Sequence, residues 1–272
     1  MRACIEGVSI WGPGLEGWAA SRPILSGEQP YVARESPPPP AAVLSAIERR
    51  RAGVVTRLAL AVAREAVAMS ALPAAGLRSV FGSASGDGIV IHAILEALAN
   101  GDPVSPTQFH NSVHNSPAGY WSIGTSSAQP VSCLGCHDDT FAAALLKAMA
   151  EVRVERVPVL LCVYDVPLPT PLDAKYKIAA PFGVGLVLSP VDGGTDAPLV
   201  SVEYEASPPL SGPEAPRESG LRTLSRTVPA ARALRLLESL ARGVPDAFAL
   251  AFLDGRLDVH LDPCSTVSRF SA

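Results

Sequence analysis

A continuous apolar run near the middle of the chain, VPVLLCVYDV at residues 157–166, places the strongest constraint on the fold. Its β-branched and aliphatic residues follow one another without the polar alternation of a strand that has one solvent-facing side. Such a run indicates a strand buried on both faces, as parallel strands are when helices cover the two sides of a sheet. It therefore predicts a buried parallel strand inside a layered α/β domain.

Strand-like and helix-like segments alternate through most of the chain. The expected strands lie at residues 3–10, 78–84, 129–133, 157–166, 182–189 and 198–206, with a closing pair at 247–255 and 256–261. The expected helices lie at 54–72, 88–101, 138–151 and 229–243, and the mixed segment 105–125 is expected to be helical for much of its length. This order predicts an α/β fold with a mostly parallel sheet that carries helices on both faces.

The composition narrows the class of protein. The 272 residues carry a net charge of −4, and no basic run is longer than Arg49–Arg51, so no nucleic acid partner is expected. The first residues lack the apolar core of a signal peptide, and no apolar run approaches the roughly 20 residues of a membrane span. We therefore expect a cytoplasmic protein, whose five cysteines form no disulfide framework.

Cys133, Cys136 and His137 spell C-x-x-C-H, which can indicate haem attachment, part of a zinc site, a redox dithiol or no cofactor at all. Haem attachment needs export, for which no signal is seen. Zinc needs about four ligands, and no second C-x-x-C is present. Asp138 and Asp139 would oppose the thiolate of a redox pair. We expect Cys133 to be a small buried residue at a strand end, with no metal and no cofactor.

Several segments form a family pattern through their order and spacing. They are SVFGSASGDG (79–88), SPTQFHNSVHNSPAGYWSIGT (105–125), QPVSCLGCHDDTFAAALLKAM (129–149), PVLLCVYD (158–165) and FGVGLVLS (182–189). Together they resemble the N-terminal half of the β-ketoacyl synthases, members of the thiolase-like superfamily. The resemblance implies a thiolase-like layered fold in which residues 1–190 form one N-terminal-type half and residues 191–272 a reduced C-terminal remnant.

Cys136 falls where active ketosynthases carry their acyl-accepting cysteine when the chain is aligned through DTFAAALLKA (139–148). A thiol at a helix N-terminus can be activated as a nucleophile. The small residues that usually follow that cysteine are, however, replaced by His137, Asp138 and Asp139. Downstream of His137 only His260 is present, and it matches neither histidine motif of the family's second half. Without those groups the enolate of a decarboxylative condensation is not stabilised, so no residue is assigned a catalytic role.

These departures make the chain similar to chain-length-factor-type subunits of type II polyketide and aryl-polyene systems. The resemblance implies a non-catalytic subunit of fatty-acid or polyketide-type biosynthesis. Its partner would be a full-length β-ketoacyl-ACP synthase, which does the chemistry. The acyl carrier protein would be an indirect partner, reached through that ketosynthase. This chain would then shape the product tunnel.

The resemblance also places the subunit interface, because in this family the strand before the nucleophile lies at the sheet edge and pairs across a pseudo-twofold axis. Here that strand is Gln129–Leu134. The expected interface residues are Gln129, Pro130, Val131, Ser132 and Cys133, with His110, Asn111, His114 and Asn115 packed near the contact. If their segment is helical, His110 and His114 share one helix face, but no carboxylate lies nearby in sequence to complete a metal site.

Two functions from other classes remain open. The first is an acyltransferase or thioesterase that uses Cys136 with His110, His114 or His137 as its base. The second is a homodimeric protein that binds acyl chains. Activity of the isolated protein, or co-purification of a ketosynthase, distinguishes them from the accessory subunit.

Overall fold

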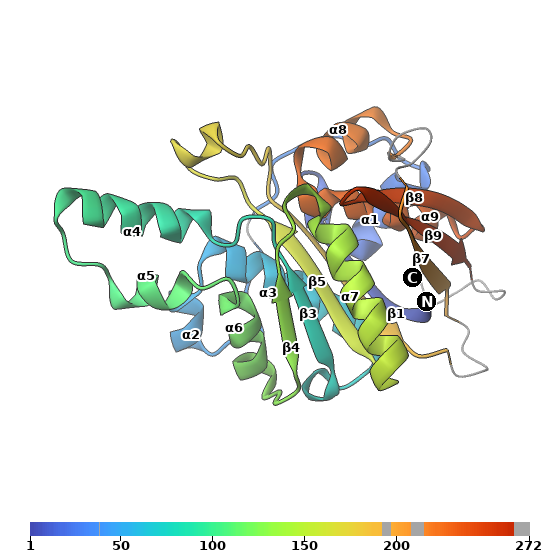
Figure 1. Cartoon of the computed structure of the whole chain (residues 1–272), viewed down its shortest axis with the longest axis horizontal. Helices are drawn as coiled ribbons and strands as arrows, with labels where there is room; N and C mark the ends of the chain where they lie inside the picture. Colours follow the sequence, from blue (N-terminus) through green and yellow to red (C-terminus); the bar gives the residue numbers. More distant parts are fainter. Residues whose placement is uncertain (38, 192–196, 208–214, 264–272) are drawn as a thin grey trace.

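The fold is built around one mixed β-sheet in the computed structural model, which describes residues 1–37, 39–191, 197–207 and 215–263 (Figure 1). Across the sheet the strand order is β4-β3-β5-β6-β1-β7-β9-β8, and the short β2 pairs with β1. The strands are β1 (Arg2–Gly12), β2 (Leu15–Glu16), β3 (Arg78–Gly82), β4 (Val131–Leu134), β5 (Val159–Asp165), β6 (Phe182–Ser189), β7 (Leu199–Glu205), β8 (Asp246–Phe252) and β9 (Gly255–Asp262).

Helices precede, follow and connect these strands. The α-helices are α1 (Trp18–Ser26), α2 (Ala46–Arg51), α3 (Val54–Ser70), α4 (Gly88–Asn100), α5 (Pro106–Asn111), α6 (Ser116–Thr125), α7 (Thr140–Glu155), α8 (Ser219–Thr227) and α9 (Leu234–Arg242). Short 3-10 turns lie at η1 (Ala74–Gly76), η2 (His137–Asp139), η3 (Leu172–Ala174) and η4 (Pro229–Ala233). The expected strands and helices are therefore present within a few residues at their ends, except that the first five residues of the helix expected at 229–243 form the 3-10 turn η4.

The prediction of a mostly parallel sheet was wrong. Among the described residues, parallel pairing joins only β3 to β4 and β3 to β5, and the other strand pairs are antiparallel. Parallel neighbours need a helical crossover, which α4 to α6 supply between β3 and β4, and α7 between β4 and β5. No α-helix lies between β5 and β6, so the chain returns antiparallel. The apolar run at 157–166 correctly indicated that both faces of the strand are buried. Burial on both faces does not determine whether a neighbouring strand runs parallel or antiparallel.

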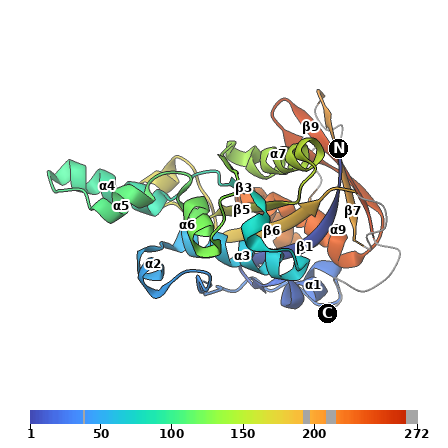
Figure 2. The same cartoon turned by 90° about the horizontal axis from the view of Figure 1, so that it is seen from below.

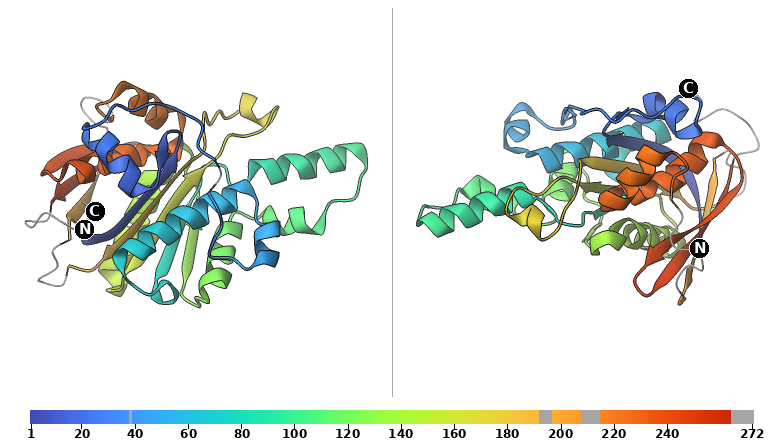
Figure 3. Two further views of the ribbon diagram at one scale, coloured as in Figure 1. Left: turned by 180° about the vertical axis from the view of Figure 1, so that it is seen from behind. Right: turned by 90° about the horizontal axis from the view of Figure 1, so that it is seen from above.

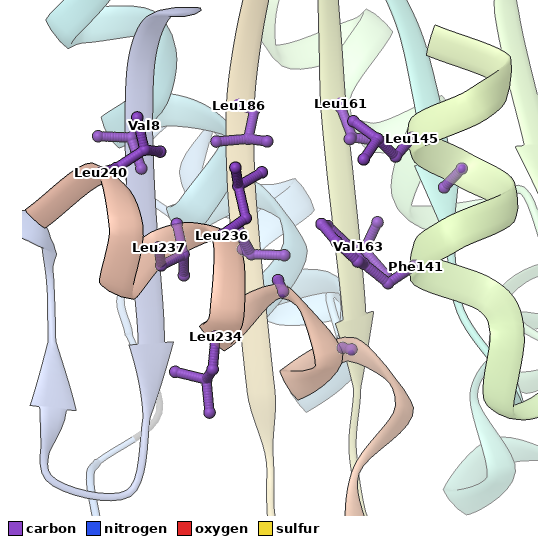
Figure 4. Close-up of a cluster of buried hydrophobic side chains, with 14 of the residues drawn as sticks. Val8, Phe141, Leu145, Leu161, Val163, Leu186, Leu234, Leu236, Leu237 and Leu240 are labelled. Carbon is purple, nitrogen blue, oxygen red and sulfur yellow. The ribbon is translucent and has the colours of Figure 1, made fainter. Parts of the chain in front are cut away.

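The core has two layers, one on each face of the sheet, and β5 contributes to both. Leu161 and Val163 face the layer formed by α7, η4 and α9, while Leu160, Cys162 and Tyr164 face the layer under α3. Successive side chains of a strand point to opposite faces, and every residue of β5 is buried. Figure 4 shows the α7 and α9 side, where Phe141 packs beside Val163 and the leucines of α9 line the sheet. Figure 2 shows α3 and α7 on opposite sides of the strands.

The residues after 190 extend this same sheet. Strand β7 pairs with the start of β1, and β9 and β8 follow outward from it. Helix α9 and turn η4 pack into the core layer that also holds α7. Residues 192–196, 208–214 and 264–272 of the expected C-terminal remnant lie outside the described ranges.

The segment 105–125 is not one helix. Helix α5 ends at Asn111, and α6 begins at Ser116 with Pro117 in its first turn. Proline favours a helix start, because its missing N–H would have no partner there. His110 therefore lies on α5 while His114 lies in the linker, so the two histidines do not share a helix face.

A pair of helices projects from the body on the side of β4. We call residues 88–111 the arm; it consists of α4, its linker and α5. Figures 1 and 3 both show the arm extending beyond the sheet, with α5 running back alongside α4. Only Gly88 of α4 is buried.

Candidate functional site

The candidate site lies where β3, β4 and β5 end, because parallel strands bring their carboxyl ends to one edge of a sheet. After β4 the chain turns sharply through Cys136 and His137 into η2 and then α7. His137 has a φ of +50°, a left-handed conformation that is uncommon for a residue other than glycine. The amide of Cys136 donates to Thr140 Oγ1 at 3.0 Å, and the Thr140 hydroxyl donates to the His137 carbonyl at 2.6 Å. The strand, turn and helix expected around Cys136 are therefore present.

The surroundings of Cys136 oppose its activation. Its side chain is half-buried, and burial raises the pKa of the thiol. The carboxylate of Asp139 raises that pKa further, because a negative charge disfavours a second one nearby. The thiolate is the nucleophilic form of cysteine. Cys136 thus occupies a nucleophile-like place but keeps its proton.

His137, in the turn, is exposed. Its imidazole packs against an aromatic ring. Its imidazole lies edge to face with Tyr176, with ring centroids 4.5 Å apart. The Tyr176 hydroxyl donates to Asp138 Oδ1 at 2.9 Å. Burial raises the pKa of Tyr176, and the hydrogen bond to Asp138 adds to the effect. The phenol therefore stays protonated and holds Asp138 in place.

One arginine pairs with both of the carboxylates that follow His137. Arg232 of η4 contacts Asp138 Oδ2 and Asp139 Oδ1, each at 3.0 Å. Asp139 Oδ2 also accepts the amide of Leu253, in the turn between β8 and β9, at 2.9 Å. The acidic residues thus tie the turn to the C-terminal part of the chain.

A buried carboxylate that the sequence analysis did not single out lies at the same edge. Asp165 ends β5 and accepts the amides of Ala84 and Ala230, both at 2.8 Å, and the Ser83 hydroxyl at 3.2 Å. Burial raises the pKa of Asp165 to about 7, although the hydrogen bonds act in the opposite direction. A carboxylate directly after an apolar strand was the signal for it in the sequence. Its oxygens are taken up by backbone and hydroxyl groups, so its role is to join β3, β5 and η4.

The three histidines considered as bases for Cys136 differ in their distance from the turn. His114 lies near the site: its Nε2–H donates to the Ser83 carbonyl at 3.0 Å, and a Cβ on Gly135 would lie 3.4 Å from that nitrogen. His110 packs edge-on against Tyr120, with centroids 6.2 Å apart. The turn therefore has His114 and His137 beside it, and both rings already have partners.

Of the two asparagines expected near the contact, Asn111 is held by hydrogen bonds to neighbouring helices. Asn111 is buried; its amide donates to the Arg51 carbonyl at 2.9 Å, and its oxygen accepts the Tyr120 hydroxyl at 3.1 Å. Asn115 is the residue before α6, and its side chain makes no capping hydrogen bond to that helix. Asn111 thus holds α5 to α2 and α6.

The first cysteine of the C-x-x-C-H pattern is a strand residue. Cys133 is partly buried on β4, against the core layer under α3, and burial raises the pKa of its thiol to about 11. In the described part of the chain no three His, Cys, Asp or Glu side chains come together as ligands for a metal ion. Cys133 therefore lies near the end of a strand, as expected, but it is only partly buried.

Strand β4 is an edge strand, as the resemblance implied, and within the described residues it pairs only with β3. The amide of Ser79 donates to the Pro130 carbonyl at 3.2 Å, which directs alternate backbone groups of β4 toward β3. The backbone groups of Val131 and Cys133 then face the open edge. Val131 is also exposed at its side chain. The edge is available for pairing, and its use as an interface stays a prediction.

The chain resembles known proteins along nearly its whole length. A family model described as β-ketoacyl synthase, N-terminal domain, matches residues 25–245. Among curated proteins, no sequence matches significantly. No helix in the described ranges is long and apolar enough to cross a membrane.

Solved structures of low sequence identity share the fold. A ketosynthase (ApeO) in complex with its chain length factor (ApeC) from Xenorhabdus doucetiae matches with a TM-score of 0.72 and 21% identity, over 96% of this chain and 99% of the other. The ishigamide ketosynthase/chain length factor matches with a TM-score of 0.69 and 14% identity, over 96% and 99%. A β-ketoacyl synthase from Burkholderia phymatum matches with a TM-score of 0.65 and 12% identity, over 96% and 99%. With the family model covering most of the chain, these findings show that the chain belongs to the β-ketoacyl synthase N-terminal domain family.

Proposed function

We propose that this protein is an accessory, chain-length-factor-type subunit that pairs with a full-length ketosynthase in fatty-acid or polyketide-type biosynthesis. In this proposal the ketosynthase carries out the condensation and receives the acyl carrier protein, while this chain shapes the space in which the product grows. The pair works in the cytoplasm. Two of the structures that share the fold are described as a ketosynthase with its chain length factor, which supports the proposal.

The observation that carries the proposal is the chemistry of the turn after β4. The fold retains the strand, turn and helix of a nucleophile site, but the pKa of Cys136 is raised by burial and by Asp139. A condensing enzyme needs the reverse, because an activated nucleophile depends on a lowered pKa or an adjacent base. Of the two histidines beside the turn, His137 packs on Tyr176 and His114 donates to the Ser83 carbonyl. This arrangement supports a structural role for the turn.

The open edge of β4 supports pairing. An exposed strand edge offers unpaired N–H and C=O groups and is usually covered in a functional protein. Because the backbone groups of Val131 and Cys133 face outward, a second sheet can continue the first at this edge. The proposal assigns that position to the ketosynthase.

The test is to express an affinity-tagged chain in its native host and identify the ketosynthase that co-purifies. Condensation is then measured with acyl and malonyl carrier proteins for the chain alone, the ketosynthase alone and the pair. We expect no ketoacyl product from the chain alone, and a product whose length depends on the chain in the pair. Robust product from the isolated chain would overturn the proposal and favour the Cys136-dependent enzyme.

A further inference from the structure

A cavity of about 440 Å³ opens between three segments that lie far apart in the sequence. It is bounded by the end of α1 with the turn after it, by the residues directly before α8, and by α9. Helix α1 packs against α9 on the side of the molecule away from the arm (Figure 1). The volume falls in the range of cavities that hold small molecules, about 300–1,000 Å³.

A buried carboxylate at this cavity lacks a hydrogen bond on one of its two oxygens. Glu238 of α9 is 3% exposed, and its Oε1 accepts the amide of Arg217 at 2.9 Å. Its Oε2 accepts no hydrogen bond from a described residue, and it lies 3.9 Å from Nη1 of Arg235, too far for one. A buried acceptor without a donor is unfavourable. Oε2 therefore marks a place where a donor group of a ligand would be stabilised.

Two guanidinium groups line the same cavity. Arg242 follows Glu238 by four positions on α9, a spacing at which opposite charges commonly pair. Its Nη1 is nevertheless buried and donates no hydrogen bond within the described residues. The side chain of Arg217 is exposed, and it forms no ion pair with the part of the chain that the structure describes. Both groups can therefore receive an anionic ligand.

The other two carboxylates at the cavity are engaged elsewhere. Glu28 pairs with Arg22 at 3.3 Å. Glu218 is the N-cap of α8 and accepts the amide of Leu221 at 2.7 Å. The groups left open at the cavity are thus one carboxylate oxygen and two guanidinium groups.

We propose that this cavity binds a free α-amino acid with an apolar side chain. The ammonium group of the ligand donates to Oε2 of Glu238, and its carboxylate accepts from Arg242 and Arg217. Guanidinium groups suit this role because their N–H donors match the two oxygens of a carboxylate. The apolar part of the wall, which receives the side chain of the ligand, consists of Ile24, Leu25 and Pro30.

An α-amino acid fits because it carries both charges close together. Side chains four positions apart on a helix are separated by about 5–6 Å at their Cβ atoms, so the groups that Glu238 and Arg242 recognise must be neighbours. A phosphate or a dicarboxylate would bring negative charge to Glu238, and a polyamine would meet two arginines. A single water molecule, with a volume of about 30 Å³, fills little of the cavity.

Binding includes a movement of one side chain. Oε2 of Glu238 and Nη1 of Arg242 are both covered by protein. Arg242 as a whole is partly exposed, so it can change its rotamer without disturbing the core. The proposal assigns this rotamer change to ligand binding.

The test is isothermal titration calorimetry of the purified full chain with L-leucine and with two analogues that each lack one charge. Isocaproate keeps the carboxylate without the ammonium group, and isoamylamine keeps the ammonium group without the carboxylate. We expect L-leucine to bind at least ~10-fold more tightly than either analogue, as expected for one more hydrogen bond to a charged group. The measurement needs no partner protein, so its outcome leaves the proposed function untouched.

Two variants test the two ends of the ligand. Arg242→Gln should weaken L-leucine at least ~10-fold and keep the wild-type circular dichroism, because this side chain is partly exposed. Glu238→Gln keeps an acceptor for the amide of Arg217 but loses the charge, so it should no longer prefer L-leucine to isocaproate. Arg64→Gln, at an exposed side chain of α3 outside the cavity, is the matched control and should bind like wild type.

Three results would overturn the proposal. Equal binding of L-leucine and isocaproate by wild type would show a general carboxylate site. No binding of L-leucine to wild type at millimolar concentration would show that the cavity holds only water. Wild-type binding by Arg242→Gln would place the amino acid elsewhere, and this variant decides alone if Glu238→Gln does not fold.

Discussion

The carboxylate of Asp165, at the end of β5, accepts a hydrogen bond from the amide of Ala230 in η4 at 2.8 Å. Burial raises the pKa of this carboxyl to about 7, above the ordinary value near 3.9 of an unfolded chain. The folded state therefore holds the proton more tightly than the unfolded state does. Asp165 contributes stability that is fully present below about pH 4 and is lost as the pH rises to about 7.

The variant Asp165→Asn tests this linkage, because its amide cannot ionise. We expect the free energy of unfolding of wild type to fall relative to that of the variant between pH 4 and 7, by a few kcal/mol at most, and then to level off. Urea unfolding at several pH values measures the difference. The exposed Asp254→Asn serves as the control and should keep the wild-type slope. Parallel curves for wild type and Asp165→Asn would contradict the assignment.

Cys136 is expected to be dispensable for the activity of the pair. Its raised pKa leaves little thiolate, so the substitutions Cys136→Ala and Cys136→Gln remove no reacting group. Product formation by the pair should change by less than several-fold. A loss near ~10³-fold, which corresponds to about 4 kcal/mol, would show a chemical role for the thiol.

Arg232 is expected to hold the turn after β4 in place. In Arg232→Gln both ion pairs to Asp138 and Asp139 are lost, and the unfolding free energy should fall by about 1 kcal/mol, since the pairs are partly exposed. Loss of the positive charge also leaves Asp139 uncompensated, so alkylation of Cys136 by iodoacetamide should become slower. The matched control is Arg22→Gln, which removes a surface pair with Glu28 and should change neither measurement. Faster alkylation in Arg232→Gln would refute this account.

The backbone of Val131 is expected to form part of the interface. Its N–H faces the open edge, so Val131→Pro removes a donor that β3 does not use. We expect the variant to fold, but to lose pairing with the ketosynthase in size-exclusion chromatography. A matched proline at Ser132, whose backbone faces β3 and whose hydroxyl donates to Glu151 at 2.9 Å, should unfold the protein instead. Wild-type pairing by Val131→Pro would exclude edge-to-edge contact.

The sequence predicted the elements well and their spatial relations less well. The run at 157–166 correctly indicated a strand buried on two faces, but direction depends on connections, and the antiparallel return of β6 follows from the absence of a helix after β5. The helix at 88–101 was correct, but periodicity cannot tell which face another element covers, so the exposure of Leu98 was not foreseen. The short break around His114 was missed because it carries no glycine or proline before Pro117.

The sequence predicted the position of the candidate site at the turn, but it did not predict which distant residues contact the turn. The position of Cys136 followed from the order of strand, turn and helix, which is local in sequence. Asp165 and Arg232 reach the same edge from distant parts of the chain. Their convergence depends on the sheet order, which no local pattern encodes.

The contacts of Asp139 also determine when the turn after β4 can be completed during synthesis of the chain. This carboxylate bonds to Arg232 and to the amide of Leu253, more than 90 residues later in the chain. The ribosome makes roughly 5–20 residues per second. Arg232 and Leu253 are therefore synthesised several seconds after the turn after β4. Until then Asp138 and Asp139 lack their arginine, and the outer strands next to β7 are missing. The emerging chain therefore depends on its last fifth, and truncation before Leu253 should leave the turn without its final contact.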